Sequence, residues 1–283
     1  MLNFLIILNN KNYMRLSIVS ALDESNRKQE DVIKKFISLC DFLKQLHYDG
    51  VELSLLEPEK INVKKVEEIQ ESYEMEIPAL GTGNTFIRFG YSLGHIDETI
   101  RKKAIERIEK YIEFANNVSS KVIIGLIRGR YNLESSQTKE KLNIKSSLKE
   151  CCRLAENYNV ELLFEPINRF EIDSYNTIAE SLELIEEVNS DSLKLLVDSY
   201  HIYLEEDPGF IWEYLEEIAH NVSHIHLADC TRRAPGSGHF DFRSFLNIFR
   251  NAGYIGFVSI ETIMKPSFEE VAKESSEYLR TIL

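Results

Sequence analysis

Short apolar runs alternate with longer amphipathic runs along the chain, and the pair recurs about every thirty to forty residues. The apolar runs are rich in Leu, Ile and Val and alternate poorly with polar residues, which is typical of parallel strands buried on both faces. Eight strands are predicted in this way. They begin near Leu16, Val51, Ile77, Val122, Glu161, Lys194, Val222 and Gly256.

The intervening runs place apolar residues at i, i+3 and i+4 and charged residues on the opposite face, which predicts helices. Clear examples cover residues 31–46, 97–118, 147–158, 178–188 and 268–282. We expect Asp97, Asn176 and Pro208 to lie at helix starts, because they are residue types that favour those positions.

Strand and helix therefore alternate eight times, which favours a single (β/α)8 TIM barrel over the 283 residues. A doubly wound open sheet is the structural alternative, but no GxGxxG pattern follows the first strand. We expect residues 14–283 to form the barrel, with Met14 as the functional start. Residues 1–13 lack the basic segment and cleavage site of a signal peptide, so we expect an extension outside the fold.

The composition, with 43% hydrophobic and 28% charged residues, is that of an ordinary globular protein. A net charge of -13 argues against nucleic-acid or membrane partners. The four cysteines show no CxxC spacing, which predicts neither a zinc knuckle nor a disulfide framework and favours a cytoplasmic location.

The candidate chemistry lies where the predicted strands end, because TIM barrels build their active sites at the carboxyl ends of the strands. Strands five to eight end in Glu165, Asp198, His226 and Glu261. One carboxylate at a strand end is usually a loop start or a helix cap, but four consecutive ligand-type residues predict a site. Three oxygen donors and one imidazole suit one six-coordinate divalent cation, with Mn2+ favoured and Co2+ or Mg2+ as alternatives.

Three motifs surround these residues: EPINRFE at 165–171, DSYH at 198–201 and HIHLADCTRRAPGSGH at 224–239. On these motifs the sequence resembles the ketose 3-epimerases (tagatose and psicose/allulose epimerases) of the xylose-isomerase-like barrels. The resemblance runs from about Met14 to the C-terminus. It implies that the metal ligands are Glu165, Asp198, His226 and Glu261. It also implies that O1 and O2 of a bound ketose are contacted by Glu171, His201 and Arg232.

The expected reaction is proton transfer at a carbon next to a carbonyl, through a cis-enediolate that a cation stabilises. Inverting that carbon, C3 of the ketose, needs a carboxyl group on each face, and Glu165 and Glu261 are the natural catalytic pair. An aldose/ketose isomerase could use one of them alone, so a sugar-phosphate or hydroxypyruvate-type isomerase is the alternative. His224 lies one layer deeper than His226, and we expect it to pack inside the barrel.

The substrate is less constrained. The segment GLIRGR places Arg128 and Arg130 after strand four, and guanidinium groups bind carboxylates or phosphates. We therefore expect Arg128 to contact an anionic keto-sugar acid or sugar phosphate, with surface ion pairs as the alternative for both arginines. Gly83, like Gly81, is expected to let the backbone approach the ligand, although a tight turn would use it equally well.

GLIRGR, the GTG at 81–83 and SLGHID also resemble a subgroup of 5-keto-L-gluconate epimerases, which implies D-tagaturonate as product; the D-tagatose/D-psicose type is the other option. A more remote alternative is an endonuclease IV-like apurinic endonuclease, which would need further histidines for three zinc ions. A barrel that has lost turnover is the third class. The resemblance to the ketose 3-epimerases also implies that the protein assembles as a homodimer or homotetramer.

Overall fold

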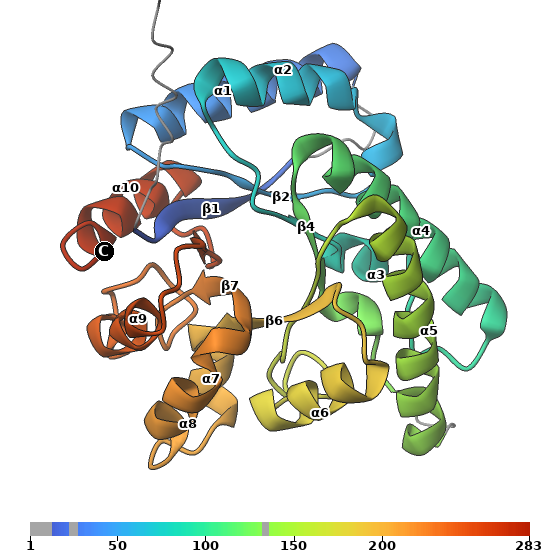
Figure 1. Cartoon of the computed structure of the whole chain (residues 1–283). Helices are drawn as coiled ribbons and strands as arrows, with labels where there is room; N and C mark the ends of the chain where they lie inside the picture. Colours follow the sequence, from blue (N-terminus) through green and yellow to red (C-terminus); the bar gives the residue numbers. More distant parts are fainter. Residues whose placement is uncertain (1–12, 23–27, 132–135) are drawn as a thin grey trace, which may run out of the picture.

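The computed structural model describes residues 13–22, 28–131 and 136–283. Eight parallel strands form a closed barrel in chain order, and β1 pairs with β8 to close it. Figure 1 shows the helices surrounding the strands. The predicted (β/α)8 barrel is confirmed, and each predicted strand is present. The strands are β1 Arg15–Ala21, β2 Glu52–Ser54, β3 Ala79–Gly81, β4 Lys121–Ile124, β5 Leu162–Phe164, β6 Leu193–Asp198, β7 Val222–Leu227 and β8 Phe257–Ile260.

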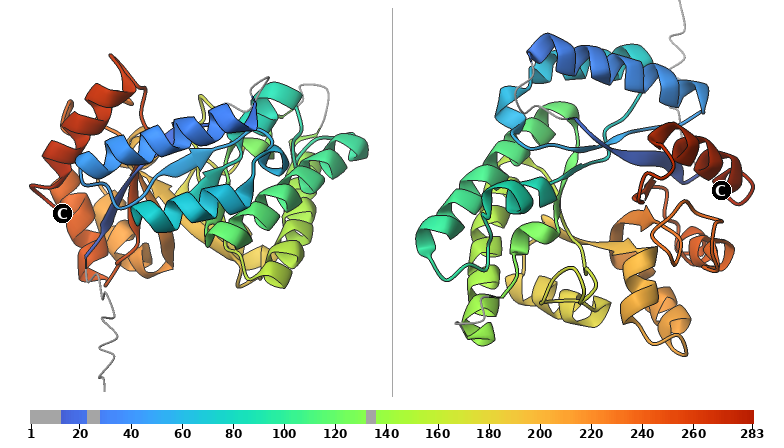
Figure 2. Two further views of the ribbon diagram at one scale, coloured as in Figure 1. Left: turned by 90° about the horizontal axis from the view of Figure 1, so that it is seen from above. Right: turned by 180° about the vertical axis from the view of Figure 1, so that it is seen from behind.

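The helices pack around the barrel, as the two further views in Figure 2 also show. In the described residues they are α1 Gln29–Gln45, α2 Val63–Tyr73, α3 Gly83–Phe89, α4 Glu98–Val118, α5 Gln137–Tyr158, α6 Ile178–Val188, α7 Ser199–Glu205, α8 Ile211–Ile218, α9 Phe242–Asn251 and α10 Phe268–Leu279. Short 3-10 turns add η1 Pro58–Lys60, η2 Leu126–Arg128 and η3 Ala219–Asn221.

The helix predictions were correct in kind but not in every boundary. Asp97 caps α4 by accepting from Thr99 N, as expected. The cap of α6 is Thr177, one residue after the predicted Asn176, because Thr177 and Glu180 form a capping box. Helix α8 begins three residues after Pro208, and α5 begins ten residues before the predicted start because its first turns are mostly polar.

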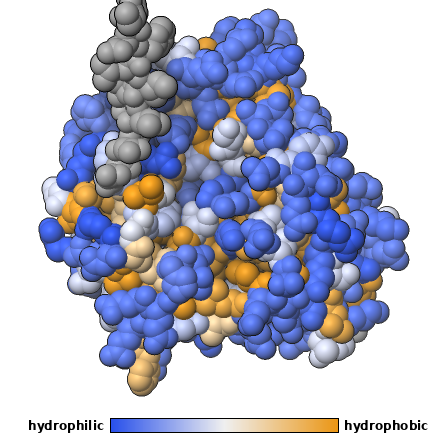
Figure 3. Space-filling model, viewed as in Figure 1, coloured by the Kyte–Doolittle hydropathy of each residue, from blue (hydrophilic) through white to orange (hydrophobic). Residues whose placement is uncertain are grey.

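The core lies mainly between the strands and the helices that surround them. A second, small apolar layer fills the barrel with inward side chains of β3 to β6: Ala79, Ile123, Leu163 and Leu196. Side chains in a strand alternate between faces, so the residue two positions after each of these also points inward. From Leu163 and Leu196 this rule leads to Glu165 and Asp198 at the barrel mouth. The molecular surface shown in Figure 3 is mostly hydrophilic, as expected when most apolar side chains are buried in the core.

The expected extension over residues 1–13 lies outside the described residues, except for Tyr13, which is half exposed. No helix among the described residues is both long and apolar enough to cross a membrane.

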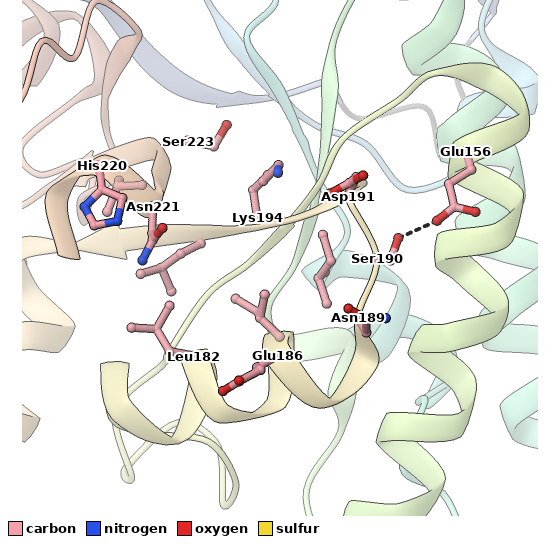
Figure 4. Close-up of a pocket in the computed structure, with 14 residues that line it drawn as sticks. Glu156, Leu182, Glu186, Asn189, Ser190, Asp191, Lys194, His220, Asn221 and Ser223 are labelled. Carbon is pink, nitrogen blue, oxygen red and sulfur yellow. Dashed lines mark hydrogen bonds between the residues drawn. The ribbon is translucent and has the colours of Figure 1, made fainter.

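A groove of about 880 Å³ lies at the amino-terminal end of the barrel, between α6 and the starts of β6 and β7. Figure 4 shows its lining, including the hydrogen bond from Ser190 to Glu156. The active sites of TIM-barrel enzymes lie at the opposite end of the barrel, where the strands have their carboxyl ends. The ligand-type residues predicted above lie at that opposite end.

Candidate active site and metal centre

The four predicted metal ligands converge at the barrel mouth. His226 Nδ1 lies 3.2 Å from Glu261 Oε2, 3.4 Å from Glu165 Oε1 and 3.8 Å from Asp198 Oδ2. Backbone hydrogen bonds extend the sheet by one residue at β5 and β8, since Glu165 N donates to Ile124 O and Glu261 N to Leu227 O. The two glutamates are therefore anchored by the barrel itself rather than by a loose loop.

Asp198 ends β6 and also caps α7. Its Oδ1 accepts from Tyr200 N at 2.8 Å, which leaves Oδ2 directed at the site. His201, in the first turn of α7, places Nε2 3.8 Å from Glu165 Oε1 and 3.9 Å from Asp198 Oδ2. The chain order Asp-Ser-Tyr-His therefore brings a carboxylate and an imidazole to one place.

Asn168 connects two of the predicted substrate contacts. Its Nδ2 lies 2.8 Å from both Glu171 Oε1 and His201 Nδ1. Because an amide nitrogen donates, Nδ1 of His201 accepts, and the ring hydrogen is assigned to Nε2. His201 can thus offer a hydrogen-bond donor toward the centre of the site.

Two buried atoms at the centre have no hydrogen-bond partner within the described part of the chain: Glu165 Oε1 and His226 Nδ1. Leaving such atoms unpaired costs roughly 1–3 kcal/mol each. Glu165, Asp198, His201 and Glu261 can also bring one ligand atom each within 4.8 Å of one another. Two unpartnered lone pairs among three carboxylates fit a divalent cation better than they fit an apolar or anionic group.

The electrostatics of Glu165 and Glu261 differ. Burial, together with the negative charge of Glu261, raises the pKa of Glu165, although His226 opposes the shift. Burial would also raise the pKa of Glu261, but Arg232 and His226 outweigh it and hold this pKa well below its usual range. A pair of carboxyl groups with pKa values pushed apart is the arrangement expected of an acid and a base that exchange protons with one substrate.

Arg232 crosses the site between two predicted ligands. Its Nη1 donates to Asp198 Oδ2 at 2.5 Å and its Nη2 donates to Glu261 Oε2. The residue has a φ of 59°, which is uncommon for a non-glycine residue and is often found at functional sites. Its backbone is fixed by hydrogen bonds to Asp229 and Ile263.

Asp229 organises the loop that carries Arg232, and sequence reasoning missed it. Its side chain is buried and accepts backbone N–H groups from Cys230, Gly236, Gly238 and Phe240. Burial would raise the pKa of Asp229, but these hydrogen bonds lower it. A Cβ on Gly238 would lie 2.2 Å from Asp229 Oδ1, so the glycine makes room for the carboxylate. The glycines of PGSG were the available signal.

Glu52 is a second residue that sequence reasoning missed. It lies inside the barrel on β2, with Oε2 2.9 Å from His224 Nε2 and 3.1 Å from His226 Nε2. Burial opposes its ionisation, but the two histidines outweigh this and lower its pKa to about 2. His224 is buried in the barrel, where it was expected. The pattern VELSL gave no sign that its glutamate points inward.

The prediction that Arg128 faces a ligand is contradicted by its position. The side chain is completely buried and donates to the carbonyls of Ile124, Glu165 and Ser174. Its guanidinium carbon lies 4.5 Å from the centre of the Phe164 ring. Burial lowers its pKa to about 10, which leaves it charged at neutral pH. Arg128 therefore fixes the backbone that carries Glu165, and with the described residues it makes none of the surface ion pairs considered as the alternative.

Arg130 and Gly83 differ from Arg128. Arg130 is partly exposed, donates to Phe170 O at 2.7 Å and lies 3.6 Å from Asp173, as in the ion-pair alternative. Gly83 begins α3, and a Cβ there would meet Leu126 at an ordinary 3.4 Å, so no neighbour among the described residues requires this glycine, and its approach to a ligand stays a prediction. Gly125 has that property instead, because its Cβ would lie 2.7 Å from Glu165 Oε2.

Comparison with known protein families identifies the family of this chain. Residues 40–282, most of the chain, match the family described as xylose isomerase-like TIM barrel. The chain belongs to this family. The resemblance inferred from the motifs of the second half is therefore confirmed at the level of the family.

The relatives of this chain include several proteins named as epimerases. A probable ketose 3-epimerase of Synechocystis sp. is 26% identical over 84% of this chain and 87% of that protein. The 3-dehydro-D-guloside 4-epimerase of Escherichia coli K12 is 26% identical over 89% of this chain and 95% of that protein. These names agree with the carbohydrate-isomerase class that the sequence predicts.

Solved structures show the same fold. The apo 3-keto-D-glucoside 4-epimerase of E. coli has a TM-score of 0.79 at 22% identity, covering 95% of this chain and 99% of that one. The D-allulose 3-epimerase of Methylomonas sp., solved with D-allulose, has a TM-score of 0.80 at 19% identity, covering 96% and 98%. At these identities the likeness supports the barrel and not the substrate.

Proposed function

We propose that the protein is a divalent-metal-dependent carbohydrate epimerase that inverts the carbon next to a ketone, C3 of a ketose, with Mn2+ as the metal. The observation that carries the proposal is the placement of Glu165 and Glu261, both within 3.4 Å of the unpartnered His226 Nδ1. Asp198 completes the proposed ligand set. Both glutamates therefore have two roles, as ligands and as proton-transfer groups.

The mechanism follows from two carboxyl groups at the ends of two strands that are not neighbours in the barrel, β5 and β8. When bound, the cation supplies stabilisation of the negative charge that develops on the substrate oxygens as the proton leaves. One glutamate takes the proton from C3 on one face, and the other returns a proton on the opposite face. In this proposal His201 Nε2–H and Arg232 donate hydrogen bonds to sugar oxygens, and Glu171 accepts one.

We propose an uncharged ketose as the substrate, of the D-tagatose or D-psicose type. Three carboxylates at the site are balanced by Arg232 and a divalent cation, which leaves no surplus positive charge for a substrate carboxylate or phosphate. The argument for a 5-keto-L-gluconate or sugar-phosphate substrate rested on Arg128, whose Nη1 and Nη2 donate to backbone carbonyls from a fully buried position. The relative named as a probable ketose 3-epimerase supports the same choice.

The test is a product analysis with the Mn2+-loaded protein. Free ketohexoses, ketogluconates and ketose phosphates are incubated separately, and products are identified by chromatography and NMR. We expect the C3 epimer of a free ketohexose. An aldose product would indicate the aldose/ketose isomerase instead, and turnover restricted to the acids or phosphates would contradict the proposed substrate class. Elemental analysis should give about one equivalent of metal per chain, whereas an apurinic endonuclease would hold about three zinc ions.

A further inference from the structure

Glu52 and His224 lie directly beneath the candidate metal centre, and the proposed mechanism assigns them no task. Both are almost completely buried, on β2 and β7. A single carboxylate oxygen, Oε2 of Glu52, lies within 3.1 Å of Nε2 of both His224 and His226. An ionised carboxylate can only accept hydrogen bonds, so each imidazole must donate from Nε2.

This arrangement decides which nitrogen of His226 can bind a cation. A neutral imidazole carries one ring hydrogen, and a hydrogen on Nε2 leaves the lone pair on Nδ1. Nδ1 is the atom that faces Glu165 and Glu261 and has no partner among the described residues. The partnered nitrogen thus points down to Glu52, and the free lone pair points up to the carboxylates.

We propose that Glu52 is a positioning residue, which holds His226 in the tautomer and ring orientation that direct Nδ1 at the divalent cation. His224 supplies a second hydrogen bond that keeps the Glu52 carboxylate in place. The inference rests on the proposed function, because it requires a cation between Glu165, Asp198 and Glu261. Carboxylates that hold metal-binding histidines in this way typically contribute about 10–100-fold to metal affinity.

The same three side chains could be taken for a second metal site, because Glu52, His224 and His226 bring ligand atoms within 4.8 Å of one another. Their hydrogen bonds argue against this. The three atoms that face one another, Glu52 Oε2 and Nε2 of His224 and His226, are already paired with one another, whereas the atoms without a partner among the described residues lie on the other side of His226. A count of bound metal separates the two interpretations.

The test is calorimetric titration of the chelator-treated full-length protein with Mn2+. The wild-type protein should bind one equivalent. Glu52→Gln should still bind one equivalent, with a dissociation constant about 10–100-fold higher. The matched control is Ser17→Ala, which removes the hydrogen bond between Ser17 and Ser259 inside the same barrel without touching either histidine. It should leave the affinity unchanged.

Each outcome bears on the inference. Wild-type affinity in Glu52→Gln would overturn it, and so would a fall from two equivalents to one, which would make Glu52 a ligand. If the wild type binds one equivalent, failure of the inference leaves the proposed function standing; if it binds none, both fail. Should Glu52→Gln not fold, Glu52→Asp keeps the charge but shortens the reach, and an affinity equal to that of the wild type would also contradict the inference.

Discussion

At the scale of single residues, the chemistry depends on where each lone pair points. Glu165 and Glu261 are anchored by backbone hydrogen bonds at the strand ends, and His226 presents an unpartnered Nδ1 between them. The pKa values of the two glutamates are shifted in opposite directions, because Glu261 contacts Arg232 while the side chain of Glu165 is buried with no such hydrogen bond from an arginine of the described residues. The two residues therefore differ in environment although they are chemically the same.

Replacing Glu261 by Gln removes a proton-transfer group while keeping its shape. We expect kcat to fall by about 10²–10⁴ or more, the range typical of losing a general acid or base. The control is Glu161→Gln at the opposite end of the barrel, which breaks an ion pair with Lys121 and should leave kcat unchanged. Initial rates and metal content are measured on the same samples. A fully active Glu261→Gln enzyme would show that Glu261 is not one of the two proton-transfer groups.

Arg128 should behave as a structural residue. Arg128→Met removes one hydrogen-bond donor from each of three carbonyl groups, and we expect a loss of about 2–4 kcal/mol in the free energy of unfolding, measured in urea. Any change in KM should be the same for neutral and acidic sugars. A selective loss of sugar acids with unchanged stability would restore the role first predicted for Arg128.

At the scale of elements, the loop after β7 is held by one buried carboxylate. Asp229 accepts four backbone hydrogen bonds within the segment that presents Arg232. The positive φ of Arg232 is maintained only while this loop keeps its shape. Through this loop, Asp229 positions Arg232, the predicted substrate contact, although Asp229 itself does not touch the reacting atoms.

Asp229→Ala should raise KM about tenfold or more, because the loss of these hydrogen bonds misplaces Arg232. Asp241→Ala is the matched control, since Asp241 caps α9 in the following segment by accepting from Ser244 N. That variant should lose about 1 kcal/mol of stability with KM unchanged. Equal KM values in the two variants would show that Asp229 does not position Arg232.

At the scale of the whole molecule, the hydrophobic pattern predicted the barrel because each strand is a local signal and the alternation with helices is regular. The four strand-end residues were predicted for the same reason. Glu52 was not, because its partners lie far along the chain on β7, and Asp229 was not, because its role depends on how the following glycine loop folds back onto its carboxylate. Arg128 was misplaced because a sequence cannot show whether a guanidinium after a strand turns outward or folds back. The homodimer or homotetramer remains a prediction.

The core should also protect three of the four cysteines. Cys40, Cys151 and Cys152 are buried, and burial raises the pKa of Cys40 to about 12 and that of Cys151 well above its usual value. Because the thiolate is the reactive form, these thiols should react slowly at pH 8. Only the half-buried Cys230 should be labelled quickly by a disulfide reagent, and all four after denaturation. Rapid labelling of two or more thiols in the folded protein would contradict the packing described.

The most direct test of the central claim, proton transfer by Glu165 and Glu261 on opposite faces of one carbon, is turnover in D2O with the Mn2+-loaded enzyme. The account predicts that the C3 epimer carries one solvent deuterium at C3, detected by NMR and mass spectrometry, because the proton removed is not the proton returned. Epimer formed without solvent deuterium at C3 would contradict the two-carboxylate mechanism.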